Sequence, residues 1–507
     1  MSKSCQRHVI IKYDTIKMRK LNIEKTACLS VAGGFFFAFF RVNILLKGGM
    51  IMEAVIILGA YFVIMMIASY CLTQRESSLK GFIVGNRQMG TVKSAMSIAA
   101  TWIWAPALFV SAEKAYSNGW PGLFWFLVPN ILCLLAFVPF ARRIRQQMPE
   151  GMTLAGYMAE QYQSQTVKKV YIGQLGLLAI LSTAVQLLAG GKILAGMLGV
   201  GFVPTMVILA GIAYSYSQFS GIQASVITDA VQMILILAAC ALLVPWALSM
   251  DGGIQNMLAG LSGISGDYSS LISESGIALF FGFGLPAALG LMAGPFGDQC
   301  FWQRAFSIKE SKIKKSFVLG TVFFAAVPLS MGILGFIAAG SGLVADKSII
   351  NYELVAQLFP AWVTVPFLFM IISGLLSTID SNLCAIASLV PELKSDTKLK
   401  HIKIAMAVLL VCGIIIADIP GITVTHLFLV YGTLRSTTML PTIFTLLGKK
   451  LSQKGICYGI LFAMIVGLPV FAAGTILNDS LYKTIGCIFA TSMGVIVAAV
   501  WRCFAHE

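Results

Sequence analysis

Apolar segments long enough to cross a lipid bilayer recur along most of this chain of 507 residues. A helix needs about 20 mainly apolar residues to span the hydrocarbon core of a membrane. Windows of about 19 residues therefore predict thirteen membrane-spanning helices in this sequence. They lie near 53–72, 94–112, 119–141, 170–191, 201–217, 222–248, 276–295, 316–342, 359–390, 403–418, 422–447, 455–476 and 481–501. The predicted fold class is an all-α polytopic membrane protein.

The distribution of Lys and Arg predicts how these helices are oriented. Five connections carry 21 of these residues, and all five fall on one side of the membrane when thirteen helices are threaded. These connections are 73–93, 142–169, 296–315, 391–403 and 448–454. The opposite side carries four basic residues, namely Lys114, Lys192, Lys347 and Lys483. Because basic connections remain in the cytoplasm, Glu507 is predicted inside and the Met52 end outside.

Composition argues against a nucleic-acid partner and against an enzyme. The chain is 58% hydrophobic and 11% charged, whereas a soluble domain has about 25% charged residues. Its net charge of +15 follows mainly from the topology, and no soluble module carries the basic face that a nucleic acid requires. The four His residues form no metal or nucleophile motif, and neither HExxH nor GxSxG occurs.

The first 51 residues do not fit the predicted topology. Residues 1–49 carry nine Lys or Arg although the threading places this segment outside. The string KGGMIME offers an explanation, because codons for Lys-Gly-Gly can contain a bacterial ribosome-binding sequence. We therefore expect translation to start at Met52, with 1–51 as a leader. Alternatively, the segment 28–49, interrupted by Arg41, crosses the membrane once and returns the N-terminus to the cytoplasm.

Two predicted helices contain residues that break helical hydrogen bonding. In 94–112, Pro106 removes a backbone donor and disturbs the carbonyl groups near residues 100–103. In 276–295, Pro286, Gly294 and Pro295 have the same effect. The two segments start five helices apart, and an odd number of helices per repeat inverts the second copy. Broken helices at such matching positions indicate the midplane site of a secondary transporter, although Gly and Pro also occur in ordinary membrane helices.

The string SGLLSTIDSNL, residues 373–383, places hydroxyl groups and a carboxylate inside an apolar helix. Polar groups at this depth are costly and usually functional. The hydroxyls of Ser377 and Thr378 are about 100° apart around a helix, so both face one cation only if another segment supplies the other side. The alternative is that they bond to carbonyl groups of their own helix.

Four strings together resemble the sodium:solute symporter family, which has the inverted-repeat fold of the bacterial leucine transporter. They are FIVGNRQMG (82–90), YSYSQFSGIQASVITDAVQ (214–232), DQCFWQRAFSIKE (298–310) and SGLLSTIDSNL. Within the family, TWIWAPALFVSAEKAYSNGWPGLFW and GTLRSTTMLPT are most similar to the urea-transporter branch. The chain departs from the family pattern at Ser220, where a Gly is usual, and at Gly374, where an Ala is usual.

The resemblance implies a domain organisation around two five-helix repeats. Residues 53–72 form a peripheral first helix and 455–501 form two peripheral helices. The core consists of repeat 94–248 and repeat 276–447, whose first helices are broken.

The resemblance also implies site residues. The shared sodium site of the family falls on Ala100, Ile103, Gly374, Ser377 and Thr378. Asp229 belongs to the route by which the ion leaves, unless it is an interfacial acid. The family's solute contacts fall on Trp102, Trp104, Asp298 and Gln299, although two Trp residues acting as interfacial anchors would give the same pattern.

One further contact is expected from membrane depth. Asp380 and Arg435 both lie inside apolar helices, where ionisable residues usually pair. We therefore expect an ion pair between Asp380 and Arg435.

The sequence thus predicts a sodium-coupled symporter that imports a small polar solute, urea among the candidates, across a bacterial inner membrane. Na⁺ is the coupling ion, and we expect no other cofactor and no obligate protein partner. Two alternatives stay open. One is coupling to protons through Asp229 or Asp380, and the other is a membrane sensor with the same fold.

Overall fold

The computed structural model describes residues 49–505, apart from 74–77, 395 and 450. The predictions for the N-terminal segment, a leader or an additional membrane crossing, concern residues that lie outside the described range up to residue 48. Nearly all described residues are helical, and the β-structure among them is one isolated parallel bridge between Met89 and Ile308. The α-helices are α2 (Gly49–Leu72), α3 (Leu79–Val84), α4 (Thr91–Trp102), α5 (Ala105–Leu108), α6 (Val110–Gln147), α7 (Leu154–Tyr162), α8 (Gln165–Leu198), α9 (Phe202–Ser217), α10 (Ile222–Ser249), α11 (Gly253–Ala259), α12 (Glu274–Leu279), α13 (Leu285–Met292), α14 (Gly294–Gly297), α15 (Gln299–Ser307), α16 (Ile313–Gly340), α17 (Ile350–Leu358), α18 (Thr364–Leu393), α19 (Leu399–Ala417), α20 (Val424–Leu446), α21 (Gln453–Phe462), α22 (Leu468–Ile476) and α23 (Ser480–Ala505).

The expected membrane spans correspond closely to these helices. Within the described residues, nine helices are long and apolar enough to cross a membrane, and two more, Ile56–Leu72 and Phe202–Ser217, are apolar but shorter. Of the thirteen predicted spans, 94–112 and 422–447 are not among these eleven. The first is a broken helix, and the second is α20, which carries the buried Arg435. The exact count of thirteen is therefore not established by length and hydropathy.

The first predicted break is present between α4 and α5. The helix ends at Trp102, and Ile103 (φ −84°, ψ 79°) and Trp104 (φ −102°, ψ 178°) are not helical. The next helix starts at Ala105 with Pro106 in its first turn. Proline fits this position because the first N–H groups of a helix have no intrahelical partner. The sequence explains the break, which leaves backbone carbonyls of α4 free to bond elsewhere.

The second break lies slightly beyond the residues expected to cause it. Asp298 is extended (φ −118°, ψ 119°) between α14 and α15, and it caps α15 by accepting from the backbone N–H of Cys300 at 2.9 Å. Pro295 is the second residue of α14, the last turn before this break. Pro286 does not interrupt the segment, because a π-helical turn over Phe280–Gly284 leads directly into α13.

Helix α20 packs closely against the second broken helix. A Cβ atom at Gly290 would lie 2.9 Å from the Cα atom of Gly432, and one at Gly297 would lie 2.5 Å from the carbonyl oxygen of Arg435. Membrane helices approach this closely only through small residues. The close approach brings Arg435 beside Asp298, at the break.

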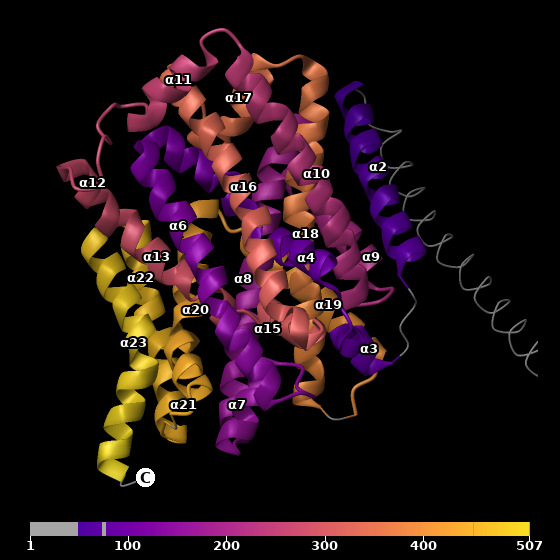
Figure 1. Cartoon of the computed structure of the whole chain (residues 1–507), viewed down its shortest axis with the longest axis vertical. Helices are drawn as coiled ribbons and strands as arrows, with labels where there is room; N and C mark the ends of the chain where they lie inside the picture. Colours follow the sequence, from indigo (N-terminus) through magenta and orange to yellow (C-terminus); the bar gives the residue numbers. More distant parts are fainter. Residues whose placement is uncertain (1–48, 74–77, 395, 450, 506–507) are drawn as a thin grey trace, which may run out of the picture.

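The bundle has two chemically different ends. The short helices α3 and α7 lie at one end, and α11 and α17 lie at the other (Figure 1). Helices α3 and α7 belong to the basic connections 73–93 and 142–169, so we name theirs the basic end and the other the opposite end. At the basic end, Lys80 donates a hydrogen bond to Glu150, and this bond lowers the pKa of the Glu150 carboxyl.

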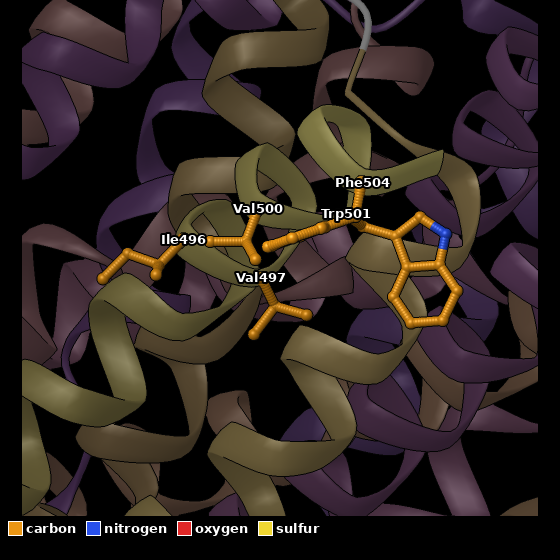
Figure 2. A pocket seen from close by; sticks show the side chains of 5 residues that line it. All are labelled: Ile496, Val497, Val500, Trp501 and Phe504. Atoms are coloured by element: carbon orange, nitrogen blue, oxygen red, sulfur yellow. The ribbon is translucent and has the colours of Figure 1, made fainter. Parts of the chain in front are cut away.

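Peripheral helices flank the core. Helix α2 lies at one edge of the bundle, and α21, α22 and α23 lie at the other (Figure 1). A hollow of about 410 Å³ lies on α23. Figure 2 shows the side chains that line it: Ile496, Val497, Val500, Trp501 and Phe504. The lining carries no charged group, so this hollow suits contact with the hydrocarbon chains of lipids and is not a candidate site for an ion.

Candidate functional site

The hydroxyls of the SGLLSTIDSNL string meet the first broken helix. Ser377 donates to the carbonyl of Ala100 at 2.9 Å, and Thr378 approaches the carbonyl of Thr101 at 3.4 Å. Both hydroxyls also lie within reach of the Gly374 carbonyl of their own helix, at 3.1 and 3.2 Å. The hydroxyls therefore contact carbonyl groups of their own helix and of the broken helix α4 at the same time.

Ile103 completes this group of residues. Its carbonyl oxygen would lie 3.2 Å from a Cβ atom placed on Gly374. The structure therefore brings all five residues expected at a sodium site into one buried region: Ala100, Ile103, Gly374, Ser377 and Thr378. Thr101 joins them, since its hydroxyl also lies 2.9 Å from that of Ser381.

Asp229 has a different environment from the one expected. It is 0% exposed and forms an ion pair with Arg304, whose Nη2 lies 2.9 Å from Asp229 Oδ2. Ser97 donates to the same oxygen at 2.6 Å, and Arg304 also donates to Ser97 at 3.0 Å and to Ser381 at 2.7 Å. Full burial argues against the alternative that Asp229 is an interfacial acid, and its place on the exit route of the ion stays a prediction. Arg304 joins α4, α10, α15 and α18.

The expected ion pair between Asp380 and Arg435 is wrong. Asp380 accepts hydrogen bonds from Ser225 at 2.7 Å and Thr228 at 3.1 Å. Arg435 pairs with Asp298, with Arg435 Nη2 2.9 Å from Asp298 Oδ2. Arg435 pairs with Asp298 because the backbone at Asp298 is extended between α14 and α15, which lets its side chain point towards α20. Asp380 keeps hydroxyl partners only, since its helix packs on α10.

The buried charges around the two broken helices do not cancel. They comprise three carboxylates and two guanidinium groups, −3 and +2, which leaves −1 when all are ionised. These side chains are Asp229, Asp298, Asp380, Arg304 and Arg435, all between 0 and 5% exposed. An uncompensated buried charge is unfavourable. Within the described part of this region, the arrangement therefore favours binding of one monovalent cation or protonation of one carboxylate.

An aromatic cluster surrounds Arg435. Its guanidinium carbon lies 4.8 Å from the ring centroid of Trp102, 5.2 Å from that of Trp104 and 3.8 Å from that of Tyr431. Tyr431 also donates to Asp298 at 2.8 Å. The two indoles stack with centroids 6.4 Å apart and are 1% and 2% exposed. They are buried in the core, so they are not interfacial anchors.

Several donors in this cluster have no acceptor. Among the described residues, the indole N–H groups of Trp102 and Trp104 and the Nε and Nη1 groups of Arg435 are buried without a hydrogen-bond partner. Buried polar groups are rarely left unsatisfied, and those that are often mark functional sites. The cluster can therefore receive a molecule that offers hydrogen-bond acceptors.

Gln299 has a structural environment. Its Oε1 accepts from the backbone N–H of Leu154 at 3.1 Å, and its Nε2 donates to the Met152 carbonyl at 3.1 Å and to Ser388 at 3.0 Å. These bonds tie α15 to the start of α7 and to α18. Both atoms of the amide have protein partners in this conformation, and the expected solute contact of Gln299 stays a prediction.

A vestibule of about 810 Å³ enters the bundle from the opposite end. It is lined by parts of α6, α8, α12, α20, α22 and α23 and by the turn around Asp346. Its charged lining residues are Lys114, Lys192, Lys347, Lys483, Glu113 and Asp346. Leu429 lines both the vestibule and a narrow cleft that reaches Arg435. The vestibule thus leads towards the aromatic cluster.

Sequence reasoning missed three residues of this region. Arg304 lies inside the quoted string DQCFWQRAFSIKE, and its place among apolar residues could have marked it as buried. Tyr431 precedes Arg435 by four positions, the spacing of neighbours on one helix face. For Ser97, neither its depth in the helix nor its spacing from other polar residues indicates a role in the sequence.

The sequence pattern of the sodium:solute symporter family matches residues 82–467. The chain belongs to the sodium:solute symporter family. As expected for this family, the protein is a multi-pass membrane protein and a solute transporter.

Individual relatives of this symporter transport different solutes. It is 24% identical to the sodium/pantothenate symporter of Escherichia coli (strain K12), over 84% of this chain and 91% of that protein. It is also 24% identical to a probable urea active transporter of Schizosaccharomyces pombe, over 51% of this chain and 40% of that protein. Urea transporters are thus among the relatives, together with a pantothenate symporter.

Solved structures confirm the fold of this symporter. A substrate-bound, outward-open Na⁺-coupled sialic acid symporter superposes with a TM-score of 0.71 at 15% identity, over 89% of this chain and 98% of that one. The transporter MhsT in complex with L-phenylalanine gives a TM-score of 0.53 at 14% identity, over 82% and 98% of the two chains. The all-α fold of the leucine-transporter type with two broken helices is confirmed.

Proposed function

We propose that this symporter uses an inward sodium gradient to import a small polar solute by alternating access. The observation that carries the proposal is the meeting of the Ser377 and Thr378 hydroxyls with the backbone oxygens at the break of α4. Hard cations such as Na⁺ take oxygen ligands, and carbonyl and hydroxyl groups supply them. Family membership and the fold support Na⁺ as the coupling ion.

The charge balance supports a monovalent cation. One Na⁺ would bring the net charge of the buried region from −1 to zero, which removes an uncompensated charge from a low-dielectric interior. Bound between α4 and α18, the ion would stabilise the arrangement of these two helices and prepare the adjoining solute site. By linkage, solute then raises the affinity for Na⁺ by the same factor as Na⁺ raises the affinity for solute.

The orientation follows from the basic connections. The basic end would face the cytoplasm of a bacterial inner membrane, with the C-terminus inside. The vestibule then opens to the outside, which makes the described conformation outward-facing. Solute would enter there and bind beside Trp102, Trp104 and Arg435.

The test is uptake into proteoliposomes with and without an inward Na⁺ gradient. Labelled urea, proline and pantothenate are suitable probes, because relatives are named for these solutes. We expect the Na⁺ gradient to drive accumulation of at least one small polar solute. Na⁺-dependent binding without any uptake would favour a sensor and refute the transport role.

A second candidate is proton coupling, which the environment of Asp380 favours. This carboxylate is fully buried and has hydroxyl partners but no cationic partner within ion-pair distance among the described residues. Its negative charge can be neutralised by binding a proton instead of by a nearby Na⁺.

Asp380→Asn separates the two candidates. If Na⁺ neutralises the region, the variant should stay sodium-driven but need about thirtyfold more Na⁺, since unit charges about 8 Å apart interact by about 2 kcal/mol at an effective dielectric constant of about 20. The measurement is uptake against Na⁺ concentration in both proteins. Proton coupling would be established instead by two results together. A pH gradient would drive uptake by the unmodified protein in Na⁺-free buffer, and Asp380→Asn would abolish that uptake.

The indole of Trp102 gives a test of the solute position. Trp102→Phe keeps an aromatic ring beside Arg435 but removes the N–H donor, so we expect solute affinity to fall about fivefold, the value of a neutral hydrogen bond of about 1 kcal/mol. Na⁺ affinity, measured by calorimetry without solute, should not change. Trp125→Phe is a matched control, because its N–H is also buried without a partner, but its ring packs on Phe280 in another part of the bundle. Equal losses of solute and Na⁺ affinity in Trp102→Phe would assign the ring to packing.

A further inference from the structure

The basic residues of the opposite end are gathered in the vestibule. All four Lys residues of the connections at that end, Lys114, Lys192, Lys347 and Lys483, line it. Of the eight acids in the same connections, Glu113 and Asp346 line it and six do not. These six are Asp251, Asp267, Glu274, Glu353, Asp418 and Asp479. The vestibule lining therefore carries +4 and −2, a net charge of +2, at an end whose connections are acidic in total.

The two vestibule acids are already engaged. Glu113 accepts from its neighbour Lys114 at 3.3 Å, and Asp346 caps its own turn by accepting from the backbone N–H and hydroxyl of Ser348 at 2.9 and 2.8 Å. Lys192 and Lys347 are exposed and belong to no ion pair among the described residues. Their charge is therefore available to an approaching solute. Low-dielectric walls focus such a field and raise the local concentration of counter-ions.

The vestibule ends at a cluster of donors. Leu429 lines both the vestibule and the narrow cleft at Arg435, and the cleft, which Phe428 also lines, has no room for a water molecule in this conformation. The cluster next to this cleft contains four buried donor groups without a hydrogen-bond partner among the described residues, on Trp102, Trp104 and Arg435. The carboxylate beside Arg435, Asp298, already accepts hydrogen bonds from Arg435, Tyr431 and the backbone N–H of Cys300. An unfilled set of donors matches a group that is rich in acceptors.

These two observations point to one solute class. We infer that the solute of this symporter carries a carboxylate, which the vestibule lysines attract and which the Arg435–Trp102–Trp104 cluster binds. A carboxylate offers two oxygens with about four acceptor positions and no donor, and charge-assisted hydrogen bonds to it are about twice as strong as neutral ones. Urea offers one oxygen and four N–H groups, which would add donors to a cluster that lacks acceptors. The inference rests on the proposed function.

A carboxylate on the solute also predicts the order in which Na⁺ and the solute bind. With all five groups ionised and no Na⁺ bound, the buried region has a net charge of −1, which disfavours a second anion. Bound Na⁺ neutralises it, so an anionic solute should bind after the ion and with a strong dependence on it. A neutral solute would show a weaker dependence.

The first experiment compares solutes in proteoliposomes under an inward Na⁺ gradient. The labelled probes are pantothenate, N-acetylneuraminate, lactate and pyruvate as carboxylates, pantothenol and urea as neutral compounds, and choline as a cation. We expect one carboxylate to be taken up at least tenfold faster than the neutral and cationic probes. Uptake of urea, pantothenol or choline with refusal of every carboxylate overturns this inference and leaves the symport function intact. Absence of Na⁺-driven uptake of any probe refutes the proposed function itself, and the inference with it.

The second experiment tests the vestibule with the transported solute. Lys192→Gln combined with Lys347→Gln should raise the KM about threefold at about 10 mM salt and less than twofold at about 150 mM salt, because the Debye length falls from about 30 Å to about 8 Å. The maximal rate should not change. Lys314→Gln with Lys315→Gln, two exposed lysines at the basic end, removes the same charge and should leave the KM unchanged. An unaltered KM in the vestibule variant, or an equal change in both variants, overturns the steering role and the inferred anionic charge.

Discussion

Replacing Ser377 by Ala together with Thr378 by Val is expected to raise the Na⁺ concentration for half-maximal uptake at least tenfold. The double variant removes two oxygens that meet the break of α4 and keeps nearly the same side-chain volume. Hydrogen bonds to charged groups are each worth about 1.5 kcal/mol or more, and a tenfold change in affinity corresponds to about 1.4 kcal/mol. The measurement is uptake at saturating solute while the Na⁺ concentration is varied.

The chain contains a matched control for this variant. Thr491 and Ser492 are also adjacent, and each hydroxyl donates to a carbonyl of its own helix at 2.8 Å, but they lie on the peripheral α23. Thr491→Val with Ser492→Ala should leave the Na⁺ requirement unchanged. Without Na⁺, both double variants should unfold within a few degrees of the unmodified protein. Unchanged sodium dependence in the Ser377–Thr378 variant would end the assignment of the site.

Arg304→Met is expected to lower the free energy of unfolding by about 3–5 kcal/mol, because it leaves the Asp229 carboxylate buried without its cation. Arg304 is 1% exposed and contacts Ser97, Asp229 and Ser381, which belong to three other helices. Asp229→Asn combined with Arg304→Met removes both charges and should recover much of the loss. The measurement is a double-mutant cycle of unfolding in detergent micelles.

A more exposed ion pair provides the control for this cycle. Lys168 and Glu392 lie 2.7 Å apart with side chains 19% and 13% exposed, so Lys168→Met should cost only about 1 kcal/mol. Transport by the double variant then decides the role of Asp229. Uptake that recovers along with stability assigns the pair to the fold. A stable double variant without uptake but with normal solute binding would support the ion-exit role.

The sequence alone was sufficient for features that depend on one segment at a time. Hydropathy located the membrane helices, and Pro106 located the break of α4, because a proline removes a hydrogen-bond donor wherever it stands. The meeting of Ala100 and Ile103 with Ser377 was anticipated through the family resemblance, and the structure brings these residues together.

Only the tertiary structure decided which buried charges pair. The sequence shows how deep Asp380 and Arg435 lie in the membrane, but not in which direction each side chain points around its helix axis. That direction depends on how the helices rotate and pack, down to the contact between Gly290 and Gly432 that brings α20 against the second break. There the side-chain carboxylate of Asp298 pairs with Arg435, and Arg304 on the following helix pairs with Asp229. Ion pairs act over a few ångströms, so partners at equal depth on separate helices are selected by packing geometry, which no single segment of the sequence contains.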